Sequence, residues 1–193
     1  MIIQVEGNIG AGKSYLCRQL GDAGLGWVAE ERIDPAFLAM FYDDPAKYAF
    51  AFQLHTAENR LSTHRAVVDG LAEDVIIDRG LFGDLVFATT ANRTGLISHH
   101  ELVVYQSLLA RRSKHRVTPD VLLYLRASPG ACARRIASRG RDEEQGMDVT
   151  YLATLHKAHD QLLAQWKEGF LVPLLGAYPA RVITKDWDEF GDV

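Results

Sequence analysis

The segment VEGNIGAGKSYL, residues 5–16, is the feature that most constrains what this chain can fold into. An apolar run, IIQV, precedes its glycines, and a helical pattern follows them. Gly7, Gly12, Lys13 and Ser14 match G-x-x-x-x-G-K-[ST], a phosphate-binding loop between a strand and a helix. Such glycines let backbone N–H groups turn inward around phosphate oxygens, and the helix adds the positive end of its dipole. The segment therefore predicts an α/β fold that grips a nucleoside triphosphate.

The residues of this loop are expected to bind different parts of ATP and its Mg²⁺ ion. Lys13 is expected to reach the terminal phosphates, and the Ser14 hydroxyl is expected to bind Mg²⁺. The predicted ATP-binding residues of the loop are Gly7, Asn8, Ile9, Gly10, Ala11, Gly12, Lys13 and Ser14. A phosphate loop alone does not separate a motor, a switch and a kinase, so the rest of the chain must do so.

Short β-rich runs alternate with longer helical patterns along the 193 residues, which fit one domain, 1–193. This alternation predicts a parallel sheet covered by helices on both faces. One long helix is predicted from Pro45 to about Leu71, and others begin near Ser98 and Asp148. The predicted strands are residues 2–5, 26–29, 74–78, 120–125 and 180–184.

Composition excludes several classes of partner. The formal net charge is −4 and the basic residues form no single block, which argues against a nucleic-acid partner. No apolar run approaches the roughly 20 residues of a membrane helix, and nothing at the N-terminus resembles a targeting peptide, so a cytoplasmic protein is expected. Cys17 and Cys132 lack metal or redox spacing and are expected to be buried as small hydrophobic residues.

Charged residues follow the second and third predicted strands. In a parallel sheet the ligand crevice lies outside the carboxyl ends of the strands, so these residues are candidates for chemistry. Glu30 or Glu31 could take a proton from an acceptor hydroxyl. Asp78 could hold Mg²⁺ with Ser14, and Arg79 could balance developing phosphate charge.

Three arginines, Arg135, Arg139 and Arg141, cluster at the end of a predicted helix and in the charged segment behind it. Cations on a mobile lid, about residues 139–147, would cover the transferred phosphate, and the planar guanidinium suits phosphate oxygens. The alternative is that these cations only complement a helix C-terminus. Their clustering beside the acidic DEE sequence favours the lid.

The segments GNIGAGKS, FYDDPAKYAFAFQ, DRGLFGD, RIASRGRDEEQG and YLATLHKAHD resemble the deoxyribonucleoside kinase family. The family includes deoxycytidine, deoxyguanosine and deoxyadenosine kinases. The resemblance implies a P-loop kinase fold with a five-stranded parallel sheet. It also implies a role in nucleotide salvage, with transfer of the ATP γ-phosphate to the 5′-hydroxyl of a deoxynucleoside in the presence of Mg²⁺. A homodimer is expected, with the helices that begin near Pro45 and Ser98 as its face.

The resemblance assigns the catalytic residues with two departures from the family pattern. The family motif Glu-Pro-Val corresponds here to EERI. Aligning Ile33 with the valine makes Glu31 the general base, which we prefer, whereas aligning the strand end makes it Glu30. The family motif Asp/Glu-Arg-Ser corresponds to residues 78–80, where glycine replaces the serine.

The resemblance also implies a sugar and base site. Tyr42 and Glu144 match the pair that holds the sugar 3′-hydroxyl, and Phe52 and Phe87 would sandwich the base. The polar residues at the base edge are Gln53, Arg60 and Asp84.

The pair of Arg60 and Asp84 resembles that of members accepting purines or cytosine. Buried polar groups demand complementary partners, so this pair predicts purine deoxynucleosides first, with deoxycytidine open.

Two other functions fit the phosphate loop. A nucleoside monophosphate kinase such as thymidylate kinase would need extra cations for the phosphate of its acceptor, where this chain places carboxylates. A catalytically silent relative would keep the fold as a binding subunit, and the departures at EERI and DRG keep that alternative open.

Overall fold

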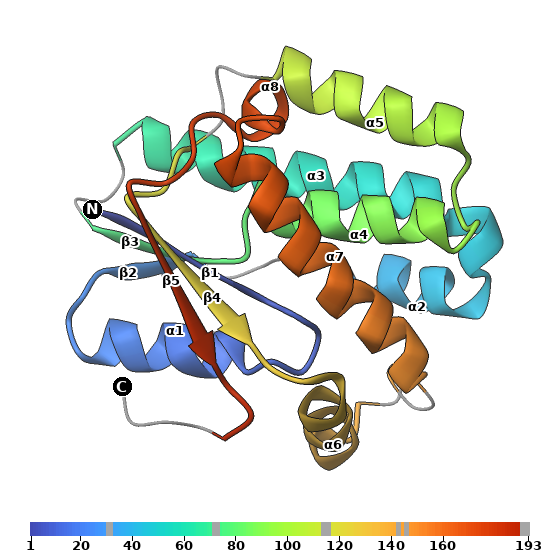
Figure 1. Ribbon diagram of the computed structural model, residues 1–193, viewed down its shortest axis with the longest axis horizontal. Helices are drawn as coiled ribbons and strands as arrows, with labels where there is room; N and C mark the ends of the chain where they lie inside the picture. Colours follow the sequence, from blue (N-terminus) through green and yellow to red (C-terminus); the bar gives the residue numbers. More distant parts are fainter. Residues whose placement is uncertain (30–32, 71–73, 113–116, 142–143, 145–146, 190–193) are drawn as a thin grey trace.

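The computed structural model describes residues 1–29, 33–70, 74–112, 117–141, 144 and 147–189. Its centre is a parallel sheet of five strands, as the sequence analysis predicts, and their order is β2-β3-β1-β4-β5. Figure 1 shows α1 on one side of this sheet and α3, α4 and α7 on the other. The strands are β1 (Ile2–Gly7), β2 (Trp27–Ala29), β3 (Val75–Asp78), β4 (Val121–Arg126) and β5 (Arg181–Asp186). The helices are α1 (Lys13–Asp22), α2 (Pro35–Asp43), α3 (Pro45–Val68), α4 (Leu81–Arg93), α5 (His99–Arg111), α6 (Pro129–Arg139), α7 (Val149–Lys167) and α8 (Val172–Leu175).

The predicted helix starts are confirmed by their caps. The Asp44 carboxylate accepts from the N–H of Lys47 at the start of α3, and Asp148 accepts from Thr150 at the start of α7. Ser98 opens α5 with a reciprocal capping box to Glu101. Each cap satisfies N–H groups that the first turn of a helix leaves unpaired.

Two helices near the site carry a weaker sequence signal, and the sequence analysis does not predict them. Helix α2 is only nine residues long, with Asp34 as its cap and Pro35 in the first turn. Helix α4 has no side-chain cap, and nine of its 13 residues are buried. A helix that is buried over most of its surface has only a weak amphipathic period, so its sequence does not separate it from a buried strand.

The two largest hydrophobic clusters of the described residues hold the layers together. Helices α3, α4, α5 and α7 share the larger cluster, in which Phe82 stacks on Trp166 with ring centroids 5.6 Å apart. The smaller cluster joins β1, α1 and α6 around residues such as Val5, Leu16 and Ile136. Helix α7 buries an apolar stripe made of Leu152, Leu155, Leu162 and Trp166.

Strand register places the phosphate loop beside the acidic end of β3. β1 pairs with β3 through Val5 and Asp78, and with β4 through Gly7 and Leu125. Because the strands are parallel, their carboxyl ends lie at one edge of the sheet, where the arrowheads of β4 and β5 point toward α6 (Figure 1).

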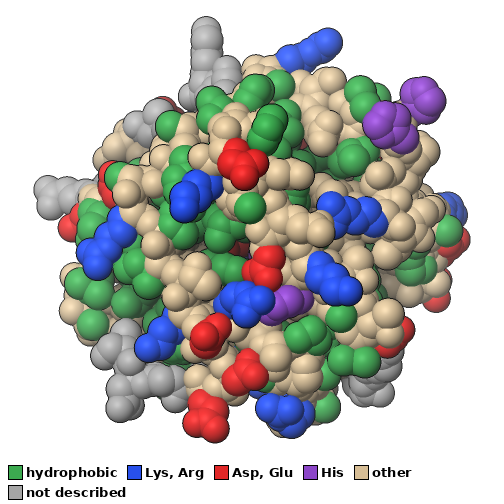
Figure 2. Space-filling view, in the orientation of Figure 1, with side chains coloured by type: hydrophobic (Ala, Val, Ile, Leu, Met, Phe, Trp, Pro, Cys, Tyr) green, Lys and Arg blue, Asp and Glu red, His purple; other side chains and the backbone are tan. Residues whose placement is uncertain are grey.

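The remaining sequence expectations concern the surface and the cysteines. Figure 2 shows basic and acidic side chains interspersed over one face of the molecule. Cys17 and Cys132 are free and buried as expected, and burial raises the pKa of Cys132 to about 11. Among the described residues, no helix combines the length and apolar character needed to cross a bilayer. The same residues contain no cluster of three or more His, Cys, Asp or Glu side chains suited to a metal.

Two buried histidines couple the fold to pH. The backbone N–H of Val117 donates to His64 Nδ1 at 3.3 Å, whereas His159 Nδ1 lies 2.8 Å from the carbonyl of Leu155, to which it donates. Burial lowers the pKa of each imidazole from the usual 6.5 to about 3. Both rings are therefore neutral in the folded protein at neutral pH.

We expect the free energy of unfolding to fall as the pH drops from about 6.5 toward 3. The unfolded chain binds protons at these histidines and the folded chain does not, so each contributes a slope of up to about 1.4 kcal/mol per pH unit. His64→Asn should remove one such slope in urea unfolding measured between pH 6.5 and 5. His99→Asn, at an exposed position on α5, is the control. An unchanged slope in His64→Asn would contradict this origin of acid sensitivity.

Candidate active site

The phosphate loop turns between β1 and α1 in a space that excludes side chains. Gly10 has φ +72°, and a Cβ there would lie 2.6 Å from the carbonyl oxygen of Cys132. Gly7 has φ +153°, and its Cβ would lie 2.8 Å from the oxygen of Leu125. Both positions need glycine for conformation and for room. The Asn8 side chain donates to the carbonyl of Leu152 at 2.9 Å, which ties the loop to α7.

The loop and β3 bring a hydroxyl and a carboxylate together. Ser14 Oγ donates to Asp78 Oδ2 at 2.6 Å, and Lys13 Nζ donates to the carbonyl of Asn8 at 2.9 Å. The second oxygen of Asp78, Oδ1, is buried and has no hydrogen-bond partner in the described part of the chain. A carboxylate oxygen left without a donor beside a serine hydroxyl fits a hard divalent cation such as Mg²⁺.

Arg79 occupies a strained turn directly after β3. Its φ of 65° lies in the left-handed region, where it is the sole residue other than glycine among those described. Its N–H donates to the carbonyl of Val5 at 3.0 Å, and its guanidinium lies over the Phe87 ring, 4.7 Å from the centroid. Backbone strain of this kind persists where the surroundings over-determine it, and it is frequent at functional sites.

One cavity of about 420 Å³ gathers most of the predicted site residues. Its walls come from the phosphate loop, from α2, α3, α4 and α7, and from the segment after α6. The predicted residues that line it are Ile9, Gly10, Lys13, Ser14, Tyr42, Phe52, Gln53, Asp78, Arg79, Asp84, Phe87, Arg139, Arg141 and Glu144. The other predicted loop residues do not line this cavity; they are Gly7, Asn8, Ala11 and Gly12.

The polar pair predicted at the base edge is formed and buried. Arg60 Nε and Nη2 donate to the two oxygens of Asp84, each at 3.2 Å. Arg60 Nη1 donates to the backbone carbonyl of Asp78 at 3.1 Å. One guanidinium thus joins Asp84 on α4 to the backbone of Asp78 at the end of β3, beside the phosphate loop.

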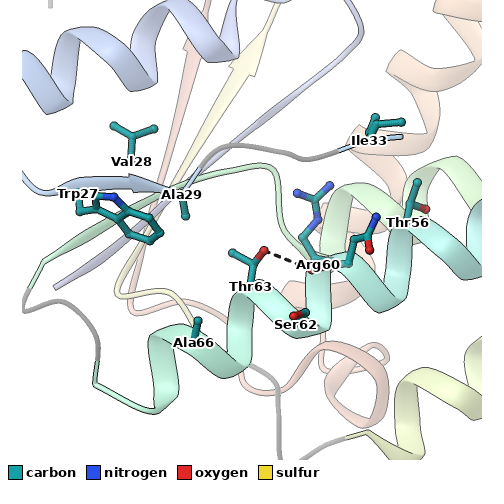
Figure 3. Close-up of a pocket in the computed structure, with 10 residues that line it drawn as sticks. Trp27, Val28, Ala29, Ile33, Thr56, Arg60, Ser62, Thr63 and Ala66 are labelled. Carbon is teal, nitrogen blue, oxygen red and sulfur yellow. Dashed lines mark hydrogen bonds between the residues drawn. The ribbon is translucent and has the colours of Figure 1, made fainter. Parts of the chain in front are cut away.

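Arg60 also lines a second cavity of about 580 Å³ between β2 and α3. Figure 3 shows Trp27, Val28 and Ala29 of β2 on one side of it, with the Arg60 side chain rising from α3 on the other. Ile33 and Thr56 line both cavities, so the two share a wall. The larger cavity holds none of the phosphate-loop residues.

The aromatic residues of the site already have ring partners. Phe52 stacks on Phe41, with centroids 4.7 Å apart and planes at 7°, and Phe41 also contacts Tyr42 at 5.4 Å. The Phe87 ring makes a cation–π contact with the guanidinium of Arg79. Phe52 and Phe87 face the same cavity, and a base sandwiched between them stays a prediction.

The expected lid arginines divide into two groups. Arg139 pairs with Glu144, and Arg141 Nη1 lies 3.8 Å from Glu144 Oε1. Arg135 instead donates to the carbonyl of Ala11 at 3.1 Å and to that of Trp187 at 2.7 Å. Arg135 therefore braces the phosphate loop from behind, outside the lining of the cavity, and its contact with ATP stays a prediction.

Comparison with known proteins agrees with this geometry. The family model described as deoxynucleoside kinase matches residues 3–191. The chain is 34% identical to a deoxyguanosine kinase of Dictyostelium discoideum over 100% of this chain and 66% of that protein. It is 32% identical to a probable deoxycytidine kinase of Fowlpox virus over 90% of this chain and 76% of the viral protein.

The chain belongs to the deoxynucleoside kinase family. The expectation of a phosphotransferase is confirmed at that level. The solved structure of a deoxyadenosine kinase from M. mycoides with bound dCTP has the same fold, with a TM-score of 0.80. That alignment covers 98% of this chain and 92% of the other at 22% identity. The chain spans about two thirds of the length of the deoxyguanosine kinase it matches.

Several residues of this deoxynucleoside kinase site are missing from the sequence analysis. Glu6 is fully buried behind the phosphate loop, where burial raises the pKa of its carboxyl group and Arg79 opposes that shift. Phe41 and Tyr151 line the cavity, and burial raises the pKa of Tyr151. A charged residue at the end of an apolar strand is the signal that could have found Glu6.

The predicted bases, Glu30 and Glu31, lie outside the described residues.

Gly10→Ala should weaken binding of ATP with Mg²⁺ roughly tenfold or more, because its Cβ would displace the loop from the carbonyl of Cys132. Gly95→Ala is the matched control, with φ +77° and nothing within 4 Å of the added Cβ. Both variants should lose about 1 to 2 kcal/mol of stability from the left-handed backbone, and only Gly10→Ala should lose affinity. Calorimetric titration and thermal unfolding separate the two effects. Equal ATP affinity in both variants would contradict the role of the loop.

Proposed function

We propose that this chain transfers the γ-phosphoryl group of ATP to the 5′-hydroxyl of a deoxynucleoside, with purine deoxynucleosides preferred and deoxycytidine as the alternative. One observation carries the proposal. The cavity of about 420 Å³ has Lys13 and Ser14 of the phosphate loop at one end, and Gln53 and Asp84 on its walls from α3 and α4. A triphosphate and a nucleoside can therefore meet inside one cavity, which is the geometric requirement of direct transfer.

Proton removal from the 5′-hydroxyl falls to a glutamate after β2. Glu31 is the preferred base and Glu30 the alternative. Ala29 and Ile33 are the described residues on either side of these glutamates. Ala29 lines the cavity of about 580 Å³, and Ile33 lines both cavities. We propose that a carboxylate between these two residues reaches the acceptor hydroxyl, as general base catalysis requires. We expect no covalent intermediate with the enzyme.

Charge on the phosphates is balanced from two sides. Ser14 and Asp78 would hold Mg²⁺, and the bound cation would supply positive charge that offsets the negative charge of the phosphates. Lys13 and Arg79 line the same cavity and add fixed positive charge. These groups act electrostatically, in a site where low dielectric strengthens each interaction.

We propose that the arginines of the lid exchange Glu144 for the phosphates of ATP when substrates bind. Arg139 and Arg141 are paired with the largely buried Glu144, and all three side chains line the cavity. Triphosphate oxygens would compete for both guanidinium groups, because bidentate contacts of arginine to phosphate are strong. Glu144 would then be released toward the sugar 3′-hydroxyl beside Tyr42, as the family resemblance implies.

Selection of the base rests on the ion pair of Arg60 and Asp84. Both side chains are buried, and Asp84 faces the cavity near Gln53. A base that offers complementary donors and acceptors satisfies these groups, whereas one that leaves a buried group unpaired loses affinity. This supports purine deoxynucleosides and also admits deoxycytidine.

We further propose a homodimer through the surface of α5. Val103 and Val104 are exposed on this helix, and exposed apolar side chains grouped on one helix favour association. The proposed dimer keeps the active-site cavity within each protomer.

A substrate panel tests the proposed function. With ATP and Mg²⁺, kcat/KM should be highest for deoxyguanosine or deoxyadenosine, lower for deoxycytidine and lowest, by roughly a hundredfold, for thymidine. Phosphorylation of deoxyguanosine monophosphate in preference to deoxyguanosine would indicate a nucleoside monophosphate kinase. ATP binding without turnover of any of the four deoxynucleosides would indicate a silent relative.

Replacing the general base should separate binding from chemistry. Glu31→Gln should lower kcat roughly 100-fold or more, with the nucleoside dissociation constant nearly unchanged. Glu58→Gln, on the exposed side of α3 where Glu58 pairs with Arg112, is the control. A loss of turnover in Glu30→Gln instead would reassign the base to Glu30. Full turnover in both glutamate variants would refute a base after β2.

A further inference from the structure

Glu6 is a buried charge to which the mechanism above gives no part. It is the residue before Gly7 at the end of β1, and its side chain is fully buried. It does not belong to the lining of either cavity, so it contacts neither proposed substrate. A buried carboxylate is expensive unless its surroundings hold it, so its contacts indicate what it does.

One oxygen of Glu6 is held by three donors. Oε1 accepts from the backbone N–H of Gly80 at 2.7 Å, from that of Gly83 at 3.2 Å, and from Gln4 Nε2 at 2.8 Å. Gly80 caps α4 and Gly83 lies in its first turn. The carboxylate therefore occupies the positive end of this helix, which favours its charged form.

The other oxygen of Glu6 faces the strained arginine. Oε2 lies 3.9 Å from Nη1 of Arg79, and both side chains are buried. At this distance the attraction is chiefly between charges, and the interior of a protein strengthens it. Phe87 supports the guanidinium from another side, with its ring centroid 4.7 Å away. Glu6 thus connects the first turn of α4 to Arg79.

The two glycines around Arg79 make room for this arrangement. A Cβ at Gly83 would lie 2.5 Å from Arg79 Cγ and 2.7 Å from Glu6 Oε2. A Cβ at Gly80 would lie 2.4 Å from both Cδ and Oε1 of Gln4. The serine that the family pattern has at position 80 therefore has no space here. The Gln4 carboxamide fills that volume from β1 and donates to Glu6.

We propose that Glu6 is a positioning residue that acts through Arg79. We also propose that Gln4, which donates to Glu6, takes the place of the serine hydroxyl that the family motif has at position 80. Glu6 holds the turn at residues 78–80 so that the guanidinium of Arg79 points into the cavity. The inference rests on the proposed function, in which Arg79 balances charge on the transferred phosphoryl group.

Kinetics test the proposal with a matched control. Glu6→Gln keeps the shape and an acceptor oxygen and removes the charge that faces Arg79. It should lower kcat roughly tenfold and leave KM for the nucleoside within about threefold. In an Arg79→Lys background the same change should have no further effect. Glu101→Gln also alters a carboxylate at a helix start, that of α5, and should leave kcat unchanged.

A spectroscopic arm is independent of activity. The side-chain Nε–H signal of Arg79, assigned by its loss in Arg79→Lys, should be sharp in the wild-type protein and broadened in Glu6→Gln. An unchanged signal together with unchanged kcat would overturn the proposal and leave Glu6 as a cap of α4 alone. If the wild-type protein phosphorylates no nucleoside, the proposed function fails, and this signal still decides whether Glu6 positions Arg79.

A reciprocal exchange tests the part of Gln4 and serves if Glu6→Gln does not fold. Gly80→Ser alone should clash with Gln4, and Gln4→Ala alone should lose the donor to Glu6, so each should broaden the Arg79 signal and lower kcat. Gln4→Ala combined with Gly80→Ser should restore both, because the serine hydroxyl can fill the space and donate. A double variant no better than the worse single variant would overturn the assignment of Gln4.

Discussion

The hydrogen bond of 2.6 Å between Ser14 and Asp78 is the contact on which the rest of the site depends. It exists because β1 and β3 are parallel neighbours in the sheet, so the loop after one strand meets the acidic end of the other. A strand order in which β1 and β3 were not neighbours would separate the phosphate loop from the carboxylate. The fold thus supplies the electrostatic centre of a phosphoryl transfer site before any substrate contact is considered.

Arg60 extends that centre to the far end of the cavity. It donates to both oxygens of Asp84 and to the backbone carbonyl of Asp78, so Asp84 on α4 and the end of β3 share one guanidinium. Glu6 lies between the start of α4 and Arg79, with its two oxygens facing one each. The strained turn is therefore held by Arg60 at the backbone carbonyl of Asp78 and by Glu6 at the side chain of Arg79.

The sequence predicts those features that local chemistry determines. The phosphate loop, the strands and the capped starts of α3, α5 and α7 each carry a signal within a few residues. Contacts between distant parts of the chain carry none: Arg135 bracing Ala11, Phe41 stacking on Phe52, and Gln4 filling the space beside Gly80. Helix α4 is not predicted because burial over most of its surface weakens its amphipathic period. The family resemblance names the substrate residues, and only the folded arrangement shows that Glu144 is paired with lid arginines.

The central claim is that ATP and a deoxynucleoside occupy one continuous cavity, with the phosphates of ATP between its adenosine and the deoxynucleoside. Binding of a bisubstrate analogue, in which a polyphosphate joins adenosine to the 5′-oxygen of deoxyguanosine, tests this most directly. The account predicts one analogue bound per chain by calorimetry, far more tightly than either half, with competition against both ATP and deoxyguanosine. Competition against ATP alone, with deoxyguanosine still binding beside the analogue, would show that the two substrates do not share this cavity and would contradict the account.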